Sequence, residues 1–368
     1  MGIGLIRVLL AFVVITAHTH PVFHLNLGSA VVAVRSFFII SGFYMAMILR
    51  GKYKSYWLFL TNRILRIYPI YWAVLLLTIL AGVGAHFITG NWGEITAFSE
   101  TIRTINPVTF IILAISNLIL LGRDVISFTF FNPTSGLLSF HALSDASFTS
   151  MQFLLVPQAW TLVLEVLFYL VAPLIVNRSL QVVGFFFGLS LAVKWYLAAH
   201  GLTSVLWTYR FFPTELCYFL LGVFAFRLYE RLRPTLRTRA VGLVATAVVT
   251  VIFLFYSYLY PALGLSFTAA EWIFYLMLTF LLPFIFLYSQ TLRYDRRVGD
   301  LSYPVYISHI LVFNVTSPLI FQPYIHNNNL EALFVFTGTI VFSLLLLKFL
   351  QYPIDRYREA RVRLATTR

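Results

Sequence analysis

Two residues that could do chemistry stand in the first apolar stretch of the chain, Arg7 and His18, with ten residues between them. Eleven helical steps of about 100° bring both side chains to nearly the same face of a helix, roughly 16 Å apart along its axis. A neutral imidazole accepts protons near neutral pH, so His18 is a candidate general base and Arg7 a candidate for stabilising negative charge. The structural alternative is a snorkelling arginine beside a histidine that is hydrogen-bonded between helices.

Charged or titratable residues interrupt three later apolar stretches, at Arg35, Glu165 and His309. Such residues are costly inside a membrane, so each is a candidate site residue. Glu165 is the only carboxylate in residues 159–176. It must be protonated or paired, and His18 or Arg35 is the expected partner. A structural ion pair between helices, and a histidine satisfied by a neighbouring helix, are the alternatives.

Arg63 and Arg66 stand three residues apart, just before Tyr68, and therefore share one helical face. Two adjacent guanidinium groups suit bidentate capture of phosphate. The alternative is an ordinary basic anchor that binds anionic lipid at the membrane surface. Lys194 and Lys348 lie near the ends of apolar stretches, and we expect both to snorkel to the surface.

The elements that must position these residues are transmembrane helices. The chain has 368 residues, of which 60% are apolar and 11% charged, whereas soluble domains carry about 25% charged residues. Apolar runs such as 67–85, 180–199, 241–260 and 334–350 match the roughly 20 residues that cross a bilayer. Backbone groups in lipid must be satisfied within the segment, so these runs should be helices.

The basic residues predict the topology. They account for a net charge of +13 and gather between the apolar runs, at 50–66, 227–239, 293–297 and 356–368, which indicates cytoplasmic segments and not nucleic-acid binding. The pattern predicts an all-α polytopic bundle of about ten spans with both termini cytoplasmic.

The count of ten spans treats residues 108–121 as re-entrant or interfacial, which makes 86–158 one large outward element. An additional span within 128–140 is the competing solution. We expect a membrane domain over 1–355 and a basic cytoplasmic tail over 356–368. The single cysteine excludes an internal disulfide, and the histidines show no metal-ligand spacing.

The order of these motifs resembles that of the acyltransferase family 3 membrane proteins, which O-acylate bacterial surface polysaccharides such as lipopolysaccharide O-antigen. The resemblance spans nearly the whole chain and rests on five pieces: Arg7 with His18, residues 37–43, Arg63-x-x-Arg66-Ile67-Tyr68-Pro69, Trp160-Thr161-Leu162-x-x-Glu165, and Tyr306-Ile307-Ser308-His309. Two features depart from the family pattern: Arg35 stands where the family often has an Asp, and the opening motif, residues 4–8, is degenerate.

The resemblance implies a multi-pass acyltransferase of the bacterial inner membrane. It implies an acyl-CoA donor, commonly acetyl-CoA, and an acceptor hydroxyl on a polysaccharide or lipid-linked sugar, with no permanently bound cofactor and no metal. It also implies that His18 and Arg7 are essential and that Arg63 and Arg66 are important. The residues expected to bind substrate are Arg63, Arg66, Arg35, Tyr68 and His309.

The mechanism expected from these residues begins with acyl-CoA docking from the cytoplasm, its phosphates held by Arg63 and Arg66, with Arg7 as a further candidate. His18 then acts as general base on the acceptor hydroxyl, Glu165 orients the imidazole or stabilises its cation, and Arg35 stabilises the oxyanion. An acyl-histidine intermediate is equally compatible with the residues. The rival functions are a proton-coupled transporter or flippase, in which His18, Glu165 and His309 relay protons, and a non-catalytic scaffold in a polysaccharide-synthesis complex.

Overall fold

The computed structural model describes residues 3–19, 27–51, 53, 55–140, 149–232, 239–321 and 327–366. It divides into two compact units, which are described separately. The first unit comprises Met1–Asn62, Val171–Val183 and Tyr218–Arg368, and the second comprises Arg63–Leu170 and Gly184–Cys217. Parts of the basic clusters, at 52, 54, 233–238 and 367–368, lie outside the described residues.

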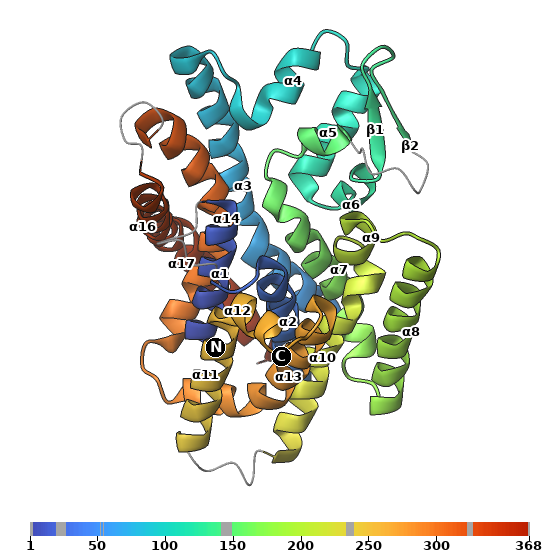
Figure 1. Cartoon of the computed structure of the whole chain (residues 1–368), viewed down its shortest axis with the longest axis vertical. Coiled ribbons are helices and arrows are strands. Elements are labelled where there is room, and N and C mark those ends of the chain that lie inside the picture. Colours follow the sequence, from blue (N-terminus) through green and yellow to red (C-terminus); the bar gives the residue numbers. More distant parts are fainter. Residues whose placement is uncertain are drawn as a thin grey trace. The chain divides into compact units, whose positions relative to one another are not determined.

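The first unit is a bundle of helices around α1 and α14 (Figure 1). Its elements are α1 (Gly4–His18), α2 (Ala30–Gly51), most of α10 (Phe212–Leu232), α11 (Arg239–Leu254), α12 (Tyr256–Ala262), α13 (Phe267–Gln290), α14 (Asp295–Thr316), α16 (Asn328–Leu346) and α17 (Tyr352–Thr366). Helix α1 packs against α2, α14 and α16, and α11 packs against α13. A buried apolar cluster of Ala11, Ile15, Val305 and Val335 joins α1, α14 and α16.

Glycines allow α2 and α10 to approach closely. A Cβ on Gly42 would lie 1.9 Å from the carbonyl oxygen of Phe219, and a Cβ on Gly222 would lie 1.9 Å from that of Ile39. A side chain at either glycine would therefore separate the two helices.

The second unit combines apolar helices with a group of short elements. The helices are most of α3 (Tyr56–Thr89), most of α7 (Trp160–Ile175), most of α8 (Leu180–Ala199) and α9 (Val205–Tyr209). The short elements are α4 (Thr96–Thr101), α5 (Pro107–Ile119), α6 (Arg123–Ile126), β1 (Thr129–Asn132), β2 (Leu137–Phe140) and the 3-10 turns Gly93–Ile95, Thr149–Phe153 and Pro157–Ala159. They share a small core of Ala97, Leu113, Ile126, Phe131, Phe153 and Leu154.

Within the described residues, seven helices are long and apolar enough to cross a membrane, or eight if α11 and α12, bent by 78° at their junction, form one broken span. The chain is therefore a multi-pass membrane protein. The count of ten spans and the cytoplasmic termini remain predictions. Helix α5 has 13 residues and extends about 20 Å, less than the roughly 30 Å of a hydrocarbon core.

The competing expectation of a span within 128–140 is wrong, because strands β1 and β2 form an antiparallel hairpin there, with Thr129 opposite Phe140. Gly136, with a φ of 67°, supplies the left-handed residue that the turn requires. Four-residue strands of this kind are far too short to cross a bilayer.

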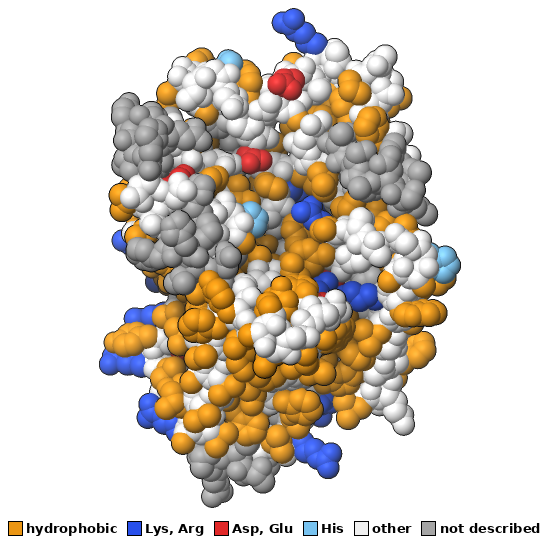
Figure 2. All heavy atoms as spheres, viewed as in Figure 1, with side chains coloured by type: hydrophobic (Ala, Val, Ile, Leu, Met, Phe, Trp, Pro, Cys, Tyr) orange, Lys and Arg blue, Asp and Glu red, His pale blue; other side chains and the backbone are white. Residues whose placement is uncertain are grey.

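The outward faces of several helices are apolar, as lipid contact requires. In α11 the exposed side chains include Val244, Val248 and Val251, and in α13 they include Ile273 and Phe280. Figure 2 shows apolar side chains over much of the surface around α11 and α13, with Lys and Arg side chains at its margins.

Candidate active site

The candidate site in the first unit is built on two helices whose N-termini are joined. Ile3, at the N-cap of α1, gives no side-chain cap, and the Asp295 carboxylate caps the helix instead. Asp295 accepts hydrogen bonds from the backbone N–H groups of Gly4, at 2.8 Å, and Leu5, at 3.2 Å. A carboxylate at this end also complements the helix dipole. A Cβ on Gly4 would lie only 1.8 Å from the Asp295 carbonyl oxygen, so this junction requires glycine.

Joined at this end, α1 and α14 run in the same direction and bring two histidines together at the other. Fourteen helical steps lead from Gly4 to His18, and fourteen from Asp295 to His309, which is about 21 Å of helix in each case. The two imidazole rings meet edge to face, with centroids 5.1 Å apart and planes at 77°. The sequence singled out both histidines, but it gave no sign that they are neighbours.

Backbone carbonyls fix the tautomers of both rings. His18 Nδ1 lies 3.0 Å from the Val14 carbonyl oxygen, and His309 Nδ1 lies 2.7 Å from that of Tyr306. A carbonyl oxygen can only accept, so in each neutral ring Nδ1 carries the hydrogen and Nε2 carries the lone pair. His18 is exposed at the C-terminal end of α1, whereas His309 is 0% exposed. Among the described residues, Nε2 of His309 has no hydrogen-bond partner.

Residues from neighbouring turns surround this histidine pair. Tyr306 contacts His309, with ring centroids 6.0 Å apart, and Phe37 of α2 contacts Tyr306 at 6.2 Å. Arg7 lies half-buried on α1, eleven residues before His18. Two of the motif pieces, residues 37–43 and 306–309, therefore meet beside the imidazoles.

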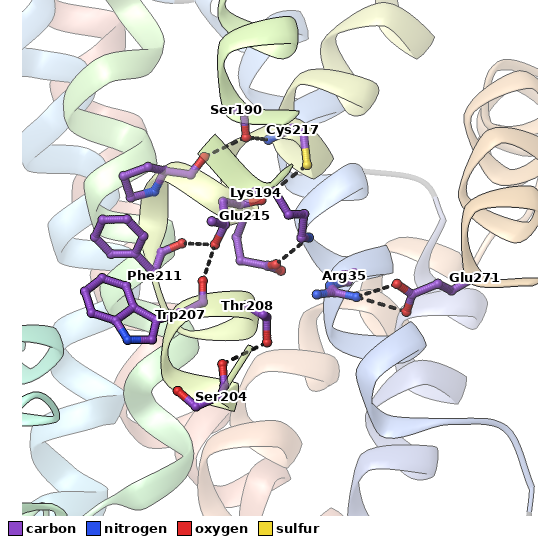
Figure 3. Close-up of polar contacts among 12 residues, drawn as sticks. Arg35, Ser190, Lys194, Ser204, Trp207, Thr208, Phe211, Glu215, Cys217 and Glu271 are labelled. Atoms are coloured by element: carbon purple, nitrogen blue, oxygen red, sulfur yellow. Dashed lines mark hydrogen bonds and ion pairs between the residues drawn. The ribbon is translucent and has the colours of Figure 1, made fainter. Parts of the chain in front are cut away.

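Arg35 forms a buried ion pair, and its partner is a residue that sequence reasoning missed. Its guanidinium donates to both carboxylate oxygens of Glu271 at 2.9 Å (Figure 3). The same guanidinium lies over the Tyr218 ring, 4.7 Å from the centroid. The two side chains of the ion pair are 6% and 7% exposed. Helix α13 begins at Phe267, so Glu271 lies inside the helix, four residues after its start. In the sequence, only Arg35 itself pointed to such a partner, because a buried arginine requires a countercharge.

The Arg63-x-x-Arg66 motif and Glu165 lie together in the second unit. Glu165 accepts a hydrogen bond from the hydroxyl of Tyr169, one turn later on α7. Both arginines of α3 act electrostatically on the same hydroxyl. Arg63 is buried, whereas Arg66 and Glu165 are half-buried. Glu165 therefore lies in a cationic environment, with Tyr169 as its hydrogen-bond partner; its expected role towards His18 stays a prediction.

Tyr68 has a structural hydrogen bond that the sequence did not suggest. The side chains of Tyr68, Tyr71 and Trp72 on α3 donate to the backbone carbonyls of residues 119, 117 and 118, respectively. These carbonyls belong to the last turn of α5, where no later residue of the helix can satisfy them. Three aromatic donors therefore fasten α5 to α3, and the hydroxyl hydrogen of Tyr68 is engaged in this contact. Its predicted role in substrate binding is untested.

Arg123 is a fully buried cation that sequence reasoning did not single out. Its guanidinium donates to the Tyr71 hydroxyl and to the Val156 carbonyl oxygen, both at 2.8 Å. Burial lowers the pKa of the Arg123 guanidinium, and the nearby Tyr71 hydroxyl opposes that shift. Arg123 connects α3, α6 and the segment before α7, which gives it a structural role.

The expectation that Lys194 snorkels is wrong. Its ammonium group forms an ion pair with Glu215 at 3.2 Å, and the two side chains are 21% and 0% exposed (Figure 3). Beside the pair, the Ser190 hydroxyl donates to the Pro213 carbonyl and accepts from the backbone N–H of Cys217. These contacts hold α8 to the start of α10. Lys348 is exposed, as expected.

Within the described residues, no group of three or more His, Cys, Asp or Glu side chains is placed to hold a metal ion. The arrangement instead offers a histidine pair with an exposed lone pair in one unit and a cationic cluster in the other. A general base and clustered positive charge are both features that acyl-transfer chemistry uses.

Comparison with known proteins agrees with this chemistry. The acyltransferase 3 family, described as an acyltransferase domain, matches residues 2–348 of the chain. No curated protein and no solved structure matches the chain. Because the family covers nearly the whole sequence, the chain belongs to the acyltransferase 3 family and is a membrane acyltransferase.

Proposed function

We propose that the protein transfers an acyl group, most simply acetyl, from cytoplasmic acyl-CoA to a hydroxyl of a surface polysaccharide or lipid-linked sugar in the bacterial inner membrane. The observation that carries the proposal is His18, an exposed imidazole whose Nδ1–H is held by the Val14 carbonyl, leaving Nε2 to accept a proton. The family match supports acyl transfer as the reaction, and the apolar helices support a membrane setting.

In the proposed reaction His18 acts on the acceptor. Its Nε2 removes the proton of the sugar hydroxyl as that oxygen attacks the thioester carbonyl carbon. A C–O bond forms, the carbonyl π electrons move to oxygen, and collapse of the tetrahedral intermediate breaks the C–S bond. The proton then passes to the departing CoA thiolate, so the enzyme ends unchanged. A positioned general base of this kind contributes about 10²–10⁴-fold to the rate.

Arg63 and Arg66 bind the donor in this proposal. Guanidinium groups on one helical face match the geometry of phosphate oxygens, and CoA carries several phosphates. The Tyr169 hydroxyl donates to Glu165 and lies within the electrostatic influence of both arginines, so a carboxylate accompanies this cationic pair. Arg7, on the same helix as His18, contributes further positive charge for the anionic donor.

The geometry gives Arg35 a different role from the expected oxyanion stabilisation. Both oxygens of Glu271 already accept hydrogen bonds from its guanidinium, and the charge of the ion pair is internally compensated. An oxyanion stabiliser is most effective when its donors are preorganised and available to the developing charge. We therefore propose that Arg35 joins α2 to α13 and does not act on the oxyanion.

The test is acyl transfer by the purified protein in nanodiscs, measured as radiolabel moved from acetyl-CoA to a lipid-linked sugar acceptor. We expect His18→Ala to lower kcat at least about 10²-fold. His200→Ala is the matched control, because His200 also bonds through Nδ1 to the carbonyl four residues earlier, at 2.8 Å, and should retain full activity.

Full activity in His18→Ala would reject the mechanism. Absence of transfer by the wild-type protein, together with movement of a labelled glycolipid across the bilayer, would favour the transporter instead. Mass spectrometry of surface glycans from cells with and without the protein would identify the acyl group and its sugar by the mass that is lost.

A further inference from the structure

We propose that Arg361, on the C-terminal helix α17, binds the terminal phosphate of the acyl-CoA donor, the phosphate monoester on the ribose. The inference rests on the proposed function, because it takes acyl-CoA as the donor. Helix α17 begins at Tyr352, after the residues that the family matches, so the family match assigns no role to this arginine.

Arg361 holds α17 against the start of α3. Its guanidinium donates from one nitrogen to Asn62 Oδ1, at 3.3 Å, and from another to Thr61 Oγ1, at 3.0 Å. Thr61 and Asn62 belong to the first unit, as α17 does. Two of the basic segments predicted to be cytoplasmic, 50–66 and 356–368, therefore contribute residues to one contact, on the predicted side of the membrane where acyl-CoA is present.

The charge of Arg361 has no carboxylate partner among the described residues. Helix α17 carries two acidic side chains, and each pairs with another arginine. Asp355 accepts a hydrogen bond from Arg358, and Glu359 forms an ion pair with Arg296 of α14 at 3.5 Å. The two acceptors of Arg361 are a neutral hydroxyl and a neutral amide, which hold the guanidinium without balancing its charge. A fixed guanidinium of this kind suits an anion, and its planar fork matches phosphate oxygens.

The guanidinium is oriented and still has donors to offer. Asn62 is 0% exposed, and its Nδ2 donates to the Tyr53 hydroxyl at 3.3 Å, which directs Oδ1 to Arg361. The guanidinium also lies 5.8 Å from the centroid of the Tyr357 ring, one turn earlier on α17. An arginine has five N–H donors, and these contacts to Thr61 and Asn62 engage two of them. Arg361 is half-buried, so a ligand can reach it.

The place of the contact along α3 favours the terminal phosphate over the diphosphate. Thr61 and Asn62 directly precede Arg63, and in the predicted topology α3 runs from the cytoplasm into the bilayer. Arg361 therefore meets α3 at a point closer to the cytoplasm than Arg63 and Arg66. The thioester of the donor must reach inward, so the nucleotide at its opposite end stays near the cytoplasm. A phosphate monoester there carries a charge of about −1.5 to −2 near pH 7.

The first test compares acetyl-CoA with acetyl-dephospho-CoA, which lacks only this phosphate, in the same nanodisc assay. The wild-type KM should be at least about tenfold lower for acetyl-CoA, because a charge-assisted hydrogen bond is lost with the phosphate. Arg361→Gln should raise the KM for acetyl-CoA at least about tenfold and leave that for acetyl-dephospho-CoA within about twofold, with kcat within about threefold.

Arg356→Gln is the matched control. Arg356 is an exposed arginine of the same helix, five residues and about 140° around the axis from Arg361. The variant removes the same charge from α17 and should keep the wild-type KM for both donors. An equal rise in KM in the two variants would show a general effect of positive charge and overturn the proposal.

Arg361→Lys separates phosphate binding from the packing of α17. Lysine keeps the charge and binds phosphate as a point charge, but it lacks the planar fork that contacts Thr61 and Asn62 together. We expect it to retain part of the preference for acetyl-CoA. Equal losses with the two donors in Arg361→Gln, or a wild-type enzyme that uses both donors equally well, would overturn the proposal.

A phospholipid headgroup offers the same phosphate chemistry, and the lipid of the nanodisc distinguishes the two sources. If Arg361 binds the donor, Arg361→Gln should raise the KM for acetyl-CoA equally in nanodiscs of phosphatidylcholine and in nanodiscs that contain phosphatidylglycerol. An effect that appears only with the anionic lipid would assign Arg361 to the headgroup and refute donor binding.

Calorimetric titration with CoA and dephospho-CoA tests the site without any acyl transfer. The wild-type protein should bind CoA at least about tenfold more tightly than dephospho-CoA, whereas Arg361→Gln should bind the two alike. Equal binding of both ligands by the wild type would reject the role of Arg361 and leave acyl-CoA as the donor. Binding of neither ligand would reject the proposed donor and this inference with it.

Discussion

The Arg35–Glu271 pair gives a prediction whose magnitude follows from its burial. Glu271→Gln keeps the shape of the side chain but removes its charge, so the guanidinium of Arg35 loses its counterion. The pair has two donor–acceptor distances of 2.9 Å, and both side chains are less than a tenth exposed. Removing one member of such a buried pair costs about 3–5 kcal/mol, because the other charge stays buried.

The assay is the unfolding free energy in detergent micelles, compared with that of a matched variant. Arg296 and Glu359 also form an Arg–Glu pair in the first unit, but at 3.5 Å, and the side chains are 71% and 48% exposed. Glu359→Gln should therefore cost less than about 1 kcal/mol. Equal losses in the two variants would refute the reasoning.

A double substitution separates the charge effect from a packing effect. Arg35→Met combined with Glu271→Leu removes both charges and replaces them with apolar side chains. If the loss in Glu271→Gln comes from the uncompensated guanidinium, the double variant should be more stable than Glu271→Gln alone. If it is less stable, shape and hydrogen bonding dominate over charge at this site.

Two further predictions concern contacts between helices. Gly4→Ala should lower the free energy of unfolding and slow acyl transfer at least about tenfold, because a Cβ would collide with the Asp295 backbone and shift α1 along α14. Gly84→Ala is the control in both assays, since nothing lies within 4 Å of its Cβ. An active Gly4→Ala enzyme would contradict the expectation. Lys194→Met should lower the free energy of unfolding by about 3 kcal/mol, because it leaves the buried Glu215 carboxylate without its cation. Lys348 is exposed, so Lys348→Met should change the free energy of unfolding little. Similar losses in the two variants would refute the buried ion pair of Lys194.

The apolar runs predicted many of the helices well. Residues 180–199 coincide with α8, and the run 159–176 with α7 to within one residue at each end. The run 241–260 was expected to be one straight span, but the chain bends by 78° between α11 and α12. A tertiary contact lies at this bend, where the Gly28 N–H donates to the Leu254 carbonyl and the Ser257 hydroxyl donates to the Gly28 carbonyl. Hydropathy has no means of seeing a partner more than two hundred residues away.

The candidate site was predictable by residue type but not by pairing. The sequence identified His18, His309 and Arg35 from the cost of polar groups in apolar runs. It did not identify Glu271, which stands only four residues after the start of its helix. The same limit applies to the His18–His309 contact, because helix periodicity reports which face a residue occupies but not which helix covers that face.

These pairings between helices escape sequence analysis because the solvent around the helices is lipid. In water, burial of an apolar stripe decides how helices pack, but lipid is as apolar as the stripe, so close packing and polar contacts must determine which helices meet and at what height. In this chain the Asp295 cap with Gly4 sets the height of α1 on α14, and the Arg35–Glu271 pair joins α2 to α13. The histidine pair lies about 21 Å from that cap, so its geometry is determined by contacts that take no part in the chemistry. Restoring the cap geometry should therefore restore catalysis in a variant whose histidines are intact, whereas no change near the cap should rescue a variant that lacks His18.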